Sequence, residues 1–165
     1  MREWIPAELA GGLSVRLVAS AAGICTIEFH PRGTIDAVRS PANPLLAEAA
    51  RQLRAYLAGS LRVFDLPLDL QGTPFQLRVW RELEKIPYGE TRSYRQVAAA
   101  IGAPEAVRAV GAANGSNPIP IVVPCHRVIG SSGKLTGYGG GLPLKKRLLE
   151  LEGALTMTMT AGEAM

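Results

Sequence analysis

Cysteine, histidine and aromatic residues are all scarce in this sequence. The two cysteines, Cys25 and Cys125, lie far apart and in different contexts, so they do not form a disulfide framework, and we expect a reducing, cytoplasmic location. Of the two histidines, His126 is next to Cys125, which leaves only Cys25 and His30 as ligands for a separate metal site. Because structural zinc needs a larger set of ligands, we expect no metal and no cofactor.

Long apolar runs are also missing. No stretch approaches the length of a membrane span, and the first residues lack the apolar core of a signal peptide, so we expect no membrane association. Apolar residues still make up 47% of the 165 residues, and charged residues only 19%. This composition is typical of a globular chain that buries a sizeable core in one large domain or two small ones.

The charges are unevenly distributed along the chain. Residues 1–72 contain seven Lys or Arg and seven Asp or Glu, whereas residues 73–153 contain eleven and six. The second part therefore carries the whole positive excess. This asymmetry favours a polyanionic partner for that part, with a solvated basic surface as the alternative.

The first part has the pattern of a small α/β domain. Alternating apolar residues predict a strand at 13–17, and residues 24–29 form its expected antiparallel partner. Asn43 before a proline predicts the start of a helix. Residues 61–70 suggest one more strand. We therefore expect residues 1–72 to form a structural support made of an antiparallel sheet and a helix.

The second part has the pattern of capped helices. Capping boxes, in which Ser or Thr is followed three residues later by Gln, begin at Thr73 and Ser93, and Pro104 is expected to start a further helix. The two short helices after Ser93 suggest a helix-turn-helix. The sequence thus predicts an α/β (α+β) protein whose domain 73–153 is mostly helical and winged-helix-like, followed by a disordered tail at 154–165.

The second helix of this pair has an unusual face of small residues. Projection at about 100° per residue puts Arg108 with Gly111, Ala112 and Gly115, opposite Val110. Such a face lets the backbone come close to another surface while one cation projects from it. Tight helix–helix packing is the alternative, but it leaves the arginine unexplained.

The strongest candidate for chemistry is Cys125, which follows an apolar run and Pro124. Proline restricts its own φ and the residue before it, so we expect Cys125 at a bend where a strand ends. A thiol reacts as the thiolate, and a nearby imidazole or cation lowers its pKa. A buried structural cysteine is the alternative, but the neighbours His126 and Arg127 favour a reactive one.

One carboxylate could support this cysteine from the last helix, which is expected to run from Pro143 to Gly153. Helical projection places Glu152 beside the buried stripe and turns Glu150 away from it. If a carboxylate serves the cysteine site, the projection therefore selects Glu152.

Taken together, these motifs resemble the O6-alkylguanine-DNA alkyltransferases. The resemblance is carried by PCHRV at 124–128, by NPIP at 117–120 and by the helix-turn-helix with its arginine. It extends over about residues 73–153 and includes IPYG at 86–89 and LLELEG at 148–153. A PCHRV match in this setting is highly specific, whereas residues 1–72 resemble the family only in layout.

The resemblance implies DNA repair by direct reversal. Cys125 would take a methyl or larger alkyl group from the O6 of a guanine flipped out of duplex DNA, less well from the O4 of thymine, and would keep it, so each chain acts once. His126 would act as the base through a water, with Glu152 holding its imidazole. Asn117 would tie the recognition helix to the active-site segment, although an ordinary Asn-Pro turn is the alternative.

The resemblance also implies a pocket and a DNA surface. Tyr94 would assist the guanine ring or the turned-out phosphate, an inward-facing aromatic of its helix being the alternative. The Val128 backbone would read the guanine, and Tyr138 and Gly139 would line the pocket. The helix would enter the minor groove of double-stranded DNA, where Arg108 fills the gap in the base stack. The implied DNA-binding residues are Ser93, Arg108, Ala109, Gly111, Ala112 and Arg127. We expect a monomer, and cooperative clustering on DNA stays open.

Two other functions remain compatible with the sequence. A non-catalytic sensor of alkylated bases would flip the base without chemistry, but such relatives lack the cysteine. A hydrolase with Cys, His and Glu would turn over many small substrates and ignore DNA, and the basic second part argues against it.

Overall fold

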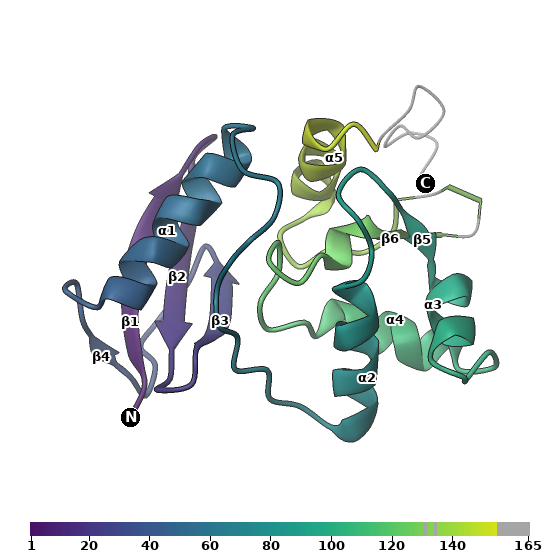
Figure 1. Ribbon diagram of the computed structural model, residues 1–165, viewed down its shortest axis with the longest axis horizontal. Helices are drawn as coiled ribbons and strands as arrows, with labels where there is room; N and C mark the ends of the chain where they lie inside the picture. The colour runs from purple at the N-terminus through teal and green to yellow at the C-terminus, as the bar shows by residue number, and fades with distance from the viewer. Residues whose placement is uncertain (131, 134, 155–165) are drawn as a thin grey trace. The chain divides into compact units, whose positions relative to one another are not determined.

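A computed structural model of the chain describes residues 1–130, 132, 133 and 135–154, and it divides into two compact units, Met1–Gln71 and a second unit that begins at Gly72 (Figure 1). Along the chain the elements are β1 (Glu3–Leu9), β2 (Leu13–Ala19), β3 (Ile24–Phe29), β4 (Val38–Arg39), α1 (Pro44–Leu57), α2 (Pro74–Leu83), β5 (Arg92–Ser93), α3 (Tyr94–Ala100), α4 (Val107–Gly115), the 3₁₀ turn η1 (Cys125–Arg127), β6 (Val128–Ile129) and α5 (Leu142–Leu151). Within the described ranges, no helix has the length and apolar character that crossing a membrane requires.

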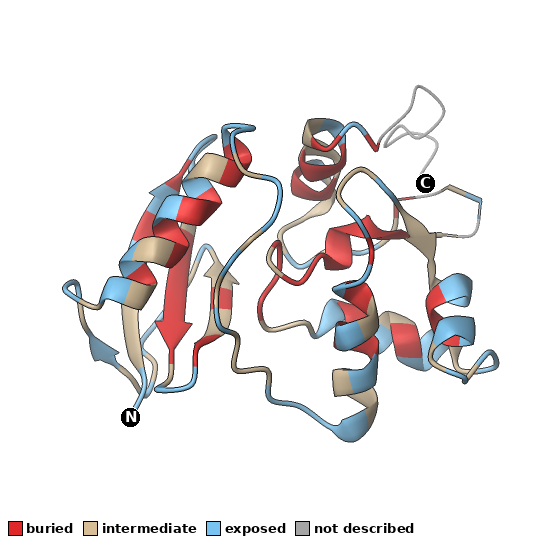
Figure 2. Cartoon of the chain, viewed as in Figure 1, coloured by how far each residue is buried: buried red, intermediate tan, exposed pale blue. Residues whose placement is uncertain are grey.

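The first unit is a four-stranded sheet covered by α1. The strand order is β3-β2-β1-β4, with β2 antiparallel to both neighbours and β4 parallel to β1. Leu17 of the central strand pairs with Ile5 and Ile27 and is fully buried. The helix turns its buried face to the sheet, as Figure 2 shows, and the Asn43 side chain caps its start as predicted. This arrangement confirms the expected sheet and helix.

Two details of the first unit differ from the sequence prediction. Strand β1 was not foreseen because Pro6 interrupts its pattern. Only Glu3 and Trp4 of β1 pair with β4, so at Pro6 the strand forms an edge of the sheet, where proline is tolerated. Residues 61–70 are not a strand and form only an isolated bridge with β3. The backbone N–H and C=O of Asp65 bond instead to the Gln52 side chain, at 2.9 and 3.0 Å, so they are not available to a ladder.

The second unit begins with the expected capped helices. Both capping boxes, at Thr73 and Ser93, are present in full. The helix predicted to start at Pro104 is wrong by one turn, because α4 begins only at Val107. Residues 103–106 form a separate turn closed by a 2.9 Å bond from the Ala106 N–H to the Ala103 carbonyl, and proline is favoured at the second position of such a turn.

The segment around Cys125 and the end of the chain also need correction. The predicted bend is present, but no strand leads into it; the two-residue strand β6 follows η1 and pairs in parallel with β5. Ala154, assigned above to a disordered tail, packs instead against Ile129, Leu135 and Leu149. Residues 155–165 lie outside the described part of the chain.

Candidate active site

The centre of the site is the 3₁₀ turn that carries Cys125 and His126. The turn closes with a 3.0 Å bond from the Arg127 N–H to the Pro124 carbonyl, so the proline before it helps to fix its start. Cys125 is only 4% exposed and His126 is fully buried. The two side chains are therefore held on adjacent residues in a site that largely excludes bulk water.

Glu152, at the C-terminal cap of α5, is the hub of a buried network. Its Oε2 lies 2.8 Å from His126 Nε2, so the carboxylate that helical projection selected reaches the cysteine site. Because a carboxylate only accepts hydrogen bonds, Nε2 must carry a proton, and Nδ1 is then the basic nitrogen of the neutral imidazole. Glu152 thus fixes both the orientation and the tautomer of the histidine.

Arg127 belongs to this network and not to an exposed surface. Its Nε and Nη2 donate to the two oxygens of Glu152 at 2.8 and 2.9 Å, and its Nη1 donates to the Ile86 carbonyl at 2.7 Å. The guanidinium also lies 5.7 Å from the centre of the Tyr88 ring. With 7% of the residue exposed and all three nitrogens engaged, the expected DNA contact of Arg127 does not fit the structure. Its contacts make it a support for Glu152.

Burial acts on the protonation of both Cys125 and His126. It raises the pKa of the Cys125 thiol, an effect opposed by a hydrogen bond from the Asn117 amide and by the charge of Lys145. It lowers the pKa of His126, and the Glu152 carboxylate opposes this effect. At neutral pH the resting pair is therefore a thiol beside a neutral imidazole. A thiolate forms only when the thiol proton is transferred within the site.

Lys145 is a functional candidate that the sequence analysis missed. It is fully buried, and its Nζ donates to the carbonyls of Val128 and Thr136, both at 2.7 Å. Burial lowers the pKa of its ammonium group to about 8, and electrostatic attraction to Cys125 opposes this shift. A signal was available, because Lys145 precedes Glu152 by seven residues and so lies on the same face of α5.

Two asparagines connect α4 with the catalytic segment. The Asn117 amide donates to the Val123 carbonyl at 2.8 Å, a contact of the kind that the tie requires, and its Oδ1 accepts from the Ile119 N–H at 3.0 Å, which is the local turn named above as the alternative. Asn114, missed from the sequence, is buried within α4 and its Nδ2 donates to the Cys125 carbonyl at 3.4 Å. Its position four residues after the inward-facing Val110 could have revealed it. The helix and the reactive turn are thus joined directly.

Two of the four predicted pocket residues, Tyr94 and Val128, are connected through Thr136 and Lys145. Tyr94, half-buried at the start of α3, accepts a 2.9 Å hydrogen bond from Thr136, and the thiolate form of Cys125 contributes to raising its pKa. Val128 is in β6, with its carbonyl bound by Lys145. Tyr138 is half-buried and Gly139 is exposed, both in the stretch before α5.

The predicted DNA-contacting face of α4 is mostly exposed. Arg108, Ala109 and Ala112 are exposed, whereas Gly111 is half-buried and a Cβ there would lie 3.9 Å from the Tyr94 ring. The Ser93 hydroxyl is half-buried and accepts the Gln96 N–H at 3.0 Å as the cap of α3. The exposed face therefore offers small side chains and one free-standing arginine, as the projection predicted.

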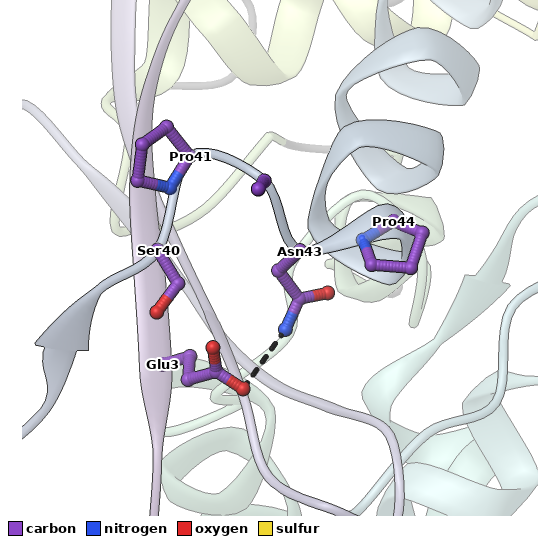
Figure 3. Close-up of a pocket in the computed structure, with 6 residues that line it drawn as sticks. Glu3, Ser40, Pro41, Asn43 and Pro44 are labelled. Atoms are coloured by element: carbon purple, nitrogen blue, oxygen red, sulfur yellow. Dashed lines mark hydrogen bonds between the residues drawn. The ribbon is translucent and has the colours of Figure 1, made fainter.

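The first unit has a hollow that shows no comparable chemistry. It lies at the start of α1, and Figure 3 shows the Glu3 carboxylate accepting a 3.2 Å bond from Asn43 Nδ2 within it. The Oδ1 of Asn43 caps the helix by accepting the N–H groups of Leu45 and Leu46. The polar groups of this hollow are thus used to join β1 to α1.

Fold and site together define a class: a protein with an α/β unit and a mostly helical unit, in which a buried cysteine, histidine and glutamate lie near the packed helices α3 and α4. Two protein-family models match the chain. The 6-O-methylguanine DNA methyltransferase DNA binding domain matches residues 74–154, and the ribonuclease-like domain of that family matches residues 15–70. The chain belongs to the methylated-DNA–protein-cysteine methyltransferase family.

Individual relatives agree with this membership. The methylated-DNA–protein-cysteine methyltransferase of Mycolicibacterium paratuberculosis is 69% identical over 106 residues, 64% of each chain, so the matched part spans just under two thirds of that relative. The constitutive Bacillus subtilis enzyme is 54% identical over 120 residues, which cover 72% of this chain and 73% of that one. The crystal structure of the Mycobacterium tuberculosis O6-methylguanine methyltransferase superposes with a TM-score of 0.84 at 48% identity over 93% of each chain.

Proposed function

We propose that this protein repairs O6-alkylguanine in double-stranded DNA by transferring the alkyl group irreversibly to Cys125. The observation that carries the proposal is the buried arrangement in which Cys125 and His126 share one turn and His126 Nε2 meets Glu152 at 2.8 Å. A nucleophile, a base and a group that orients the base are the parts that nucleophilic catalysis needs.

The proposed transfer conserves atoms and charge within the site. The thiol proton passes through a water to His126 Nδ1, and the imidazolium so formed is stabilised by Glu152. The sulfur of Cys125 attacks the alkyl carbon, a carbon–sulfur bond forms, and the bond from carbon to O6 breaks with its electron pair left on the purine. A proton then returns to the purine. A thioether is a poor leaving group, so each chain reacts once.

The proposed DNA surface is the exposed face of α4. A base inside a duplex is out of reach, so it must be flipped out at a cost of a few kcal/mol, which is smaller for a base whose pairing is damaged. Small residues such as Ala109 and Ala112 permit the close approach that the minor groove requires, and Arg108 would fill the gap left by the flipped base. A solved relative, the Mycobacterium tuberculosis OGT in complex with DNA, superposes with a TM-score of 0.81 and supports this assignment.

Intact-mass measurement after incubation with duplex DNA containing O6-methylguanine tests the proposal. We expect one added methyl group per chain, located at Cys125 by peptide mapping, with product never exceeding protein in moles. Cys25→Ser is the matched control and should react normally, whereas Cys125→Ser should bind the duplex without reacting. Binding without any mass change in the wild type would identify a damage sensor instead, and multiple turnover of a small substrate would identify a hydrolase.

A further inference from the structure

Thr136 connects two groups of the site through different atoms. Its hydroxyl donates to the Tyr94 oxygen at 2.9 Å, and its backbone carbonyl accepts from Lys145 Nζ at 2.7 Å. The same ammonium group holds the Val128 carbonyl at 2.7 Å. The backbone of Thr136 is therefore anchored by a buried cation, which leaves its side chain in a fixed position against Tyr94.

This contact determines where the Tyr94 proton can point. A phenolic oxygen both donates and accepts, so when it accepts from Thr136 its own proton is directed to another acceptor. Burial raises the pKa of Tyr94, which keeps that proton in place at neutral pH, although the Thr136 hydroxyl partly opposes the shift. Gly111 of α4 lies beside the tyrosine ring, because a Cβ built at this glycine would be in ordinary contact with the ring at 3.9 Å. While it accepts from Thr136, Tyr94 is thus a protonated hydrogen-bond donor toward another acceptor.

We propose that Thr136 is a positioning residue that aims the Tyr94 hydroxyl proton at the flipped purine. The inference rests on the proposed function, because only alkyl transfer leaves negative charge on the purine as the bond to O6 breaks. A donor fixed in advance stabilises that developing charge without reorganising. Thr136 does not touch the purine in this scheme and acts through Tyr94.

Single-turnover transfer kinetics with saturating methylated duplex test this role. Thr136→Val removes the hydroxyl, keeps the shape and leaves the backbone carbonyl for Lys145, so we expect the maximal transfer rate to fall about tenfold, with the affinity for the duplex unchanged. Thr136→Ser retains the hydroxyl and should restore most of the rate. In a Tyr94→Phe background the Thr136→Val change should have no further effect, because the group it acts through is gone.

A second measurement does not depend on activity. Ultraviolet titration, with Tyr94→Phe as the reference that removes this signal, should show that Thr136→Val raises the pKa of Tyr94 further, because it deletes the hydroxyl that lowers it. A Thr136→Val protein with the wild-type transfer rate and the wild-type tyrosine titration would overturn the inference. The inference would also fail if Thr136→Val lowered the transfer rate by the same factor in the wild-type and Tyr94→Phe backgrounds. If the wild type forms no adduct at Cys125, the proposed function fails and the inference fails with it. If the wild type forms the adduct but Thr136→Val keeps the wild-type rate and titration, only the inference fails.

Discussion

Neutralising the hub carboxylate by Glu152→Gln should strongly destabilise the second unit. The Arg127 guanidinium, in a residue only 7% exposed, would keep its charge but lose the negative charge of its partner and one of the two oxygens that it binds at 2.8 and 2.9 Å. Removing one partner of a buried ion pair costs about 3–5 kcal/mol. The Ile86 carbonyl would still accept from Arg127, so we expect the lower end of that range, about 3 kcal/mol.

Thermal and urea unfolding would measure this loss. In a domain of this size each kcal/mol is worth about 4–8 °C, so the melting temperature should fall by more than about 10 °C. The matched control is Glu150→Gln, an exposed residue on the same helix, which should stay within about 0.5 kcal/mol of the wild type. A loss under about 1 kcal/mol for Glu152→Gln would refute the reasoning, because that is the value of a solvated surface pair.

A double variant separates the uncompensated charge from the lost contacts. Arg127→Met removes the cation while keeping a long apolar side chain, so adding it to Glu152→Gln should raise stability above that of Glu152→Gln alone. Simple addition of the two separate losses would mean that the charges do not interact.

Three further predictions concern the reaction and its pH dependence. Arg108→Ala should slow transfer to duplex DNA about tenfold more than transfer to a free alkylated guanine base, since only the duplex has a gap to fill; equal losses in the two rate assays would contradict this role. Methylation of buried Cys125 should lower the free energy of unfolding by about 1–3 kcal/mol through overpacking, and coincident denaturation curves of the fresh and alkylated proteins would refute it. Burial lowers the pKa of His126 below its ordinary 6.5, so on acidification the unfolded chain binds a proton before the folded one does. The stability and the transfer rate should therefore decrease only below about pH 6.5. A midpoint above that value, in the profile of stability or of transfer rate against pH, would argue against a buried neutral imidazole.

The sequence predicted the elements whose signals are local. The boxes at Thr73 and Ser93 and the cap at Asn43 were located because capping depends on residues within one turn of the helix start. Residues 61–70 were misassigned in part because the backbone groups of Asp65 bond to the Gln52 side chain, a long-range contact that no local pattern reveals. The paired dipeptides β5 and β6 are too short to have any periodicity at all.

The site was predicted where one helix face carried the information. Glu152 was selected by projection, and its 2.8 Å contact with His126 is present. Arg127 was placed among the DNA-binding residues only as part of the set that the resemblance implied, and nothing in the sequence shows that Glu152 and the Ile86 carbonyl are close enough to hold it. Lys145 escaped for a similar reason: lysine is rarely fully buried, so its place on the Glu152 face was not weighed.

Burying so many ionisable groups makes sense when their charges are considered together. In the resting state Lys145 and Arg127 are cationic, Glu152 is anionic, and the cysteine and histidine are neutral, so the buried set carries one net positive charge. Moving the thiol proton to His126 creates a thiolate and an imidazolium without changing that total, and the excess positive charge stabilises the anion formed. Since no charge enters or leaves the buried site, a thiol whose pKa is raised by burial can still become a nucleophile at neutral pH. On the proposed function, the same argument predicts that the alkylated protein stays inert: a thioether neither carries the charge that the surrounding cations attract nor exchanges a proton with the imidazole.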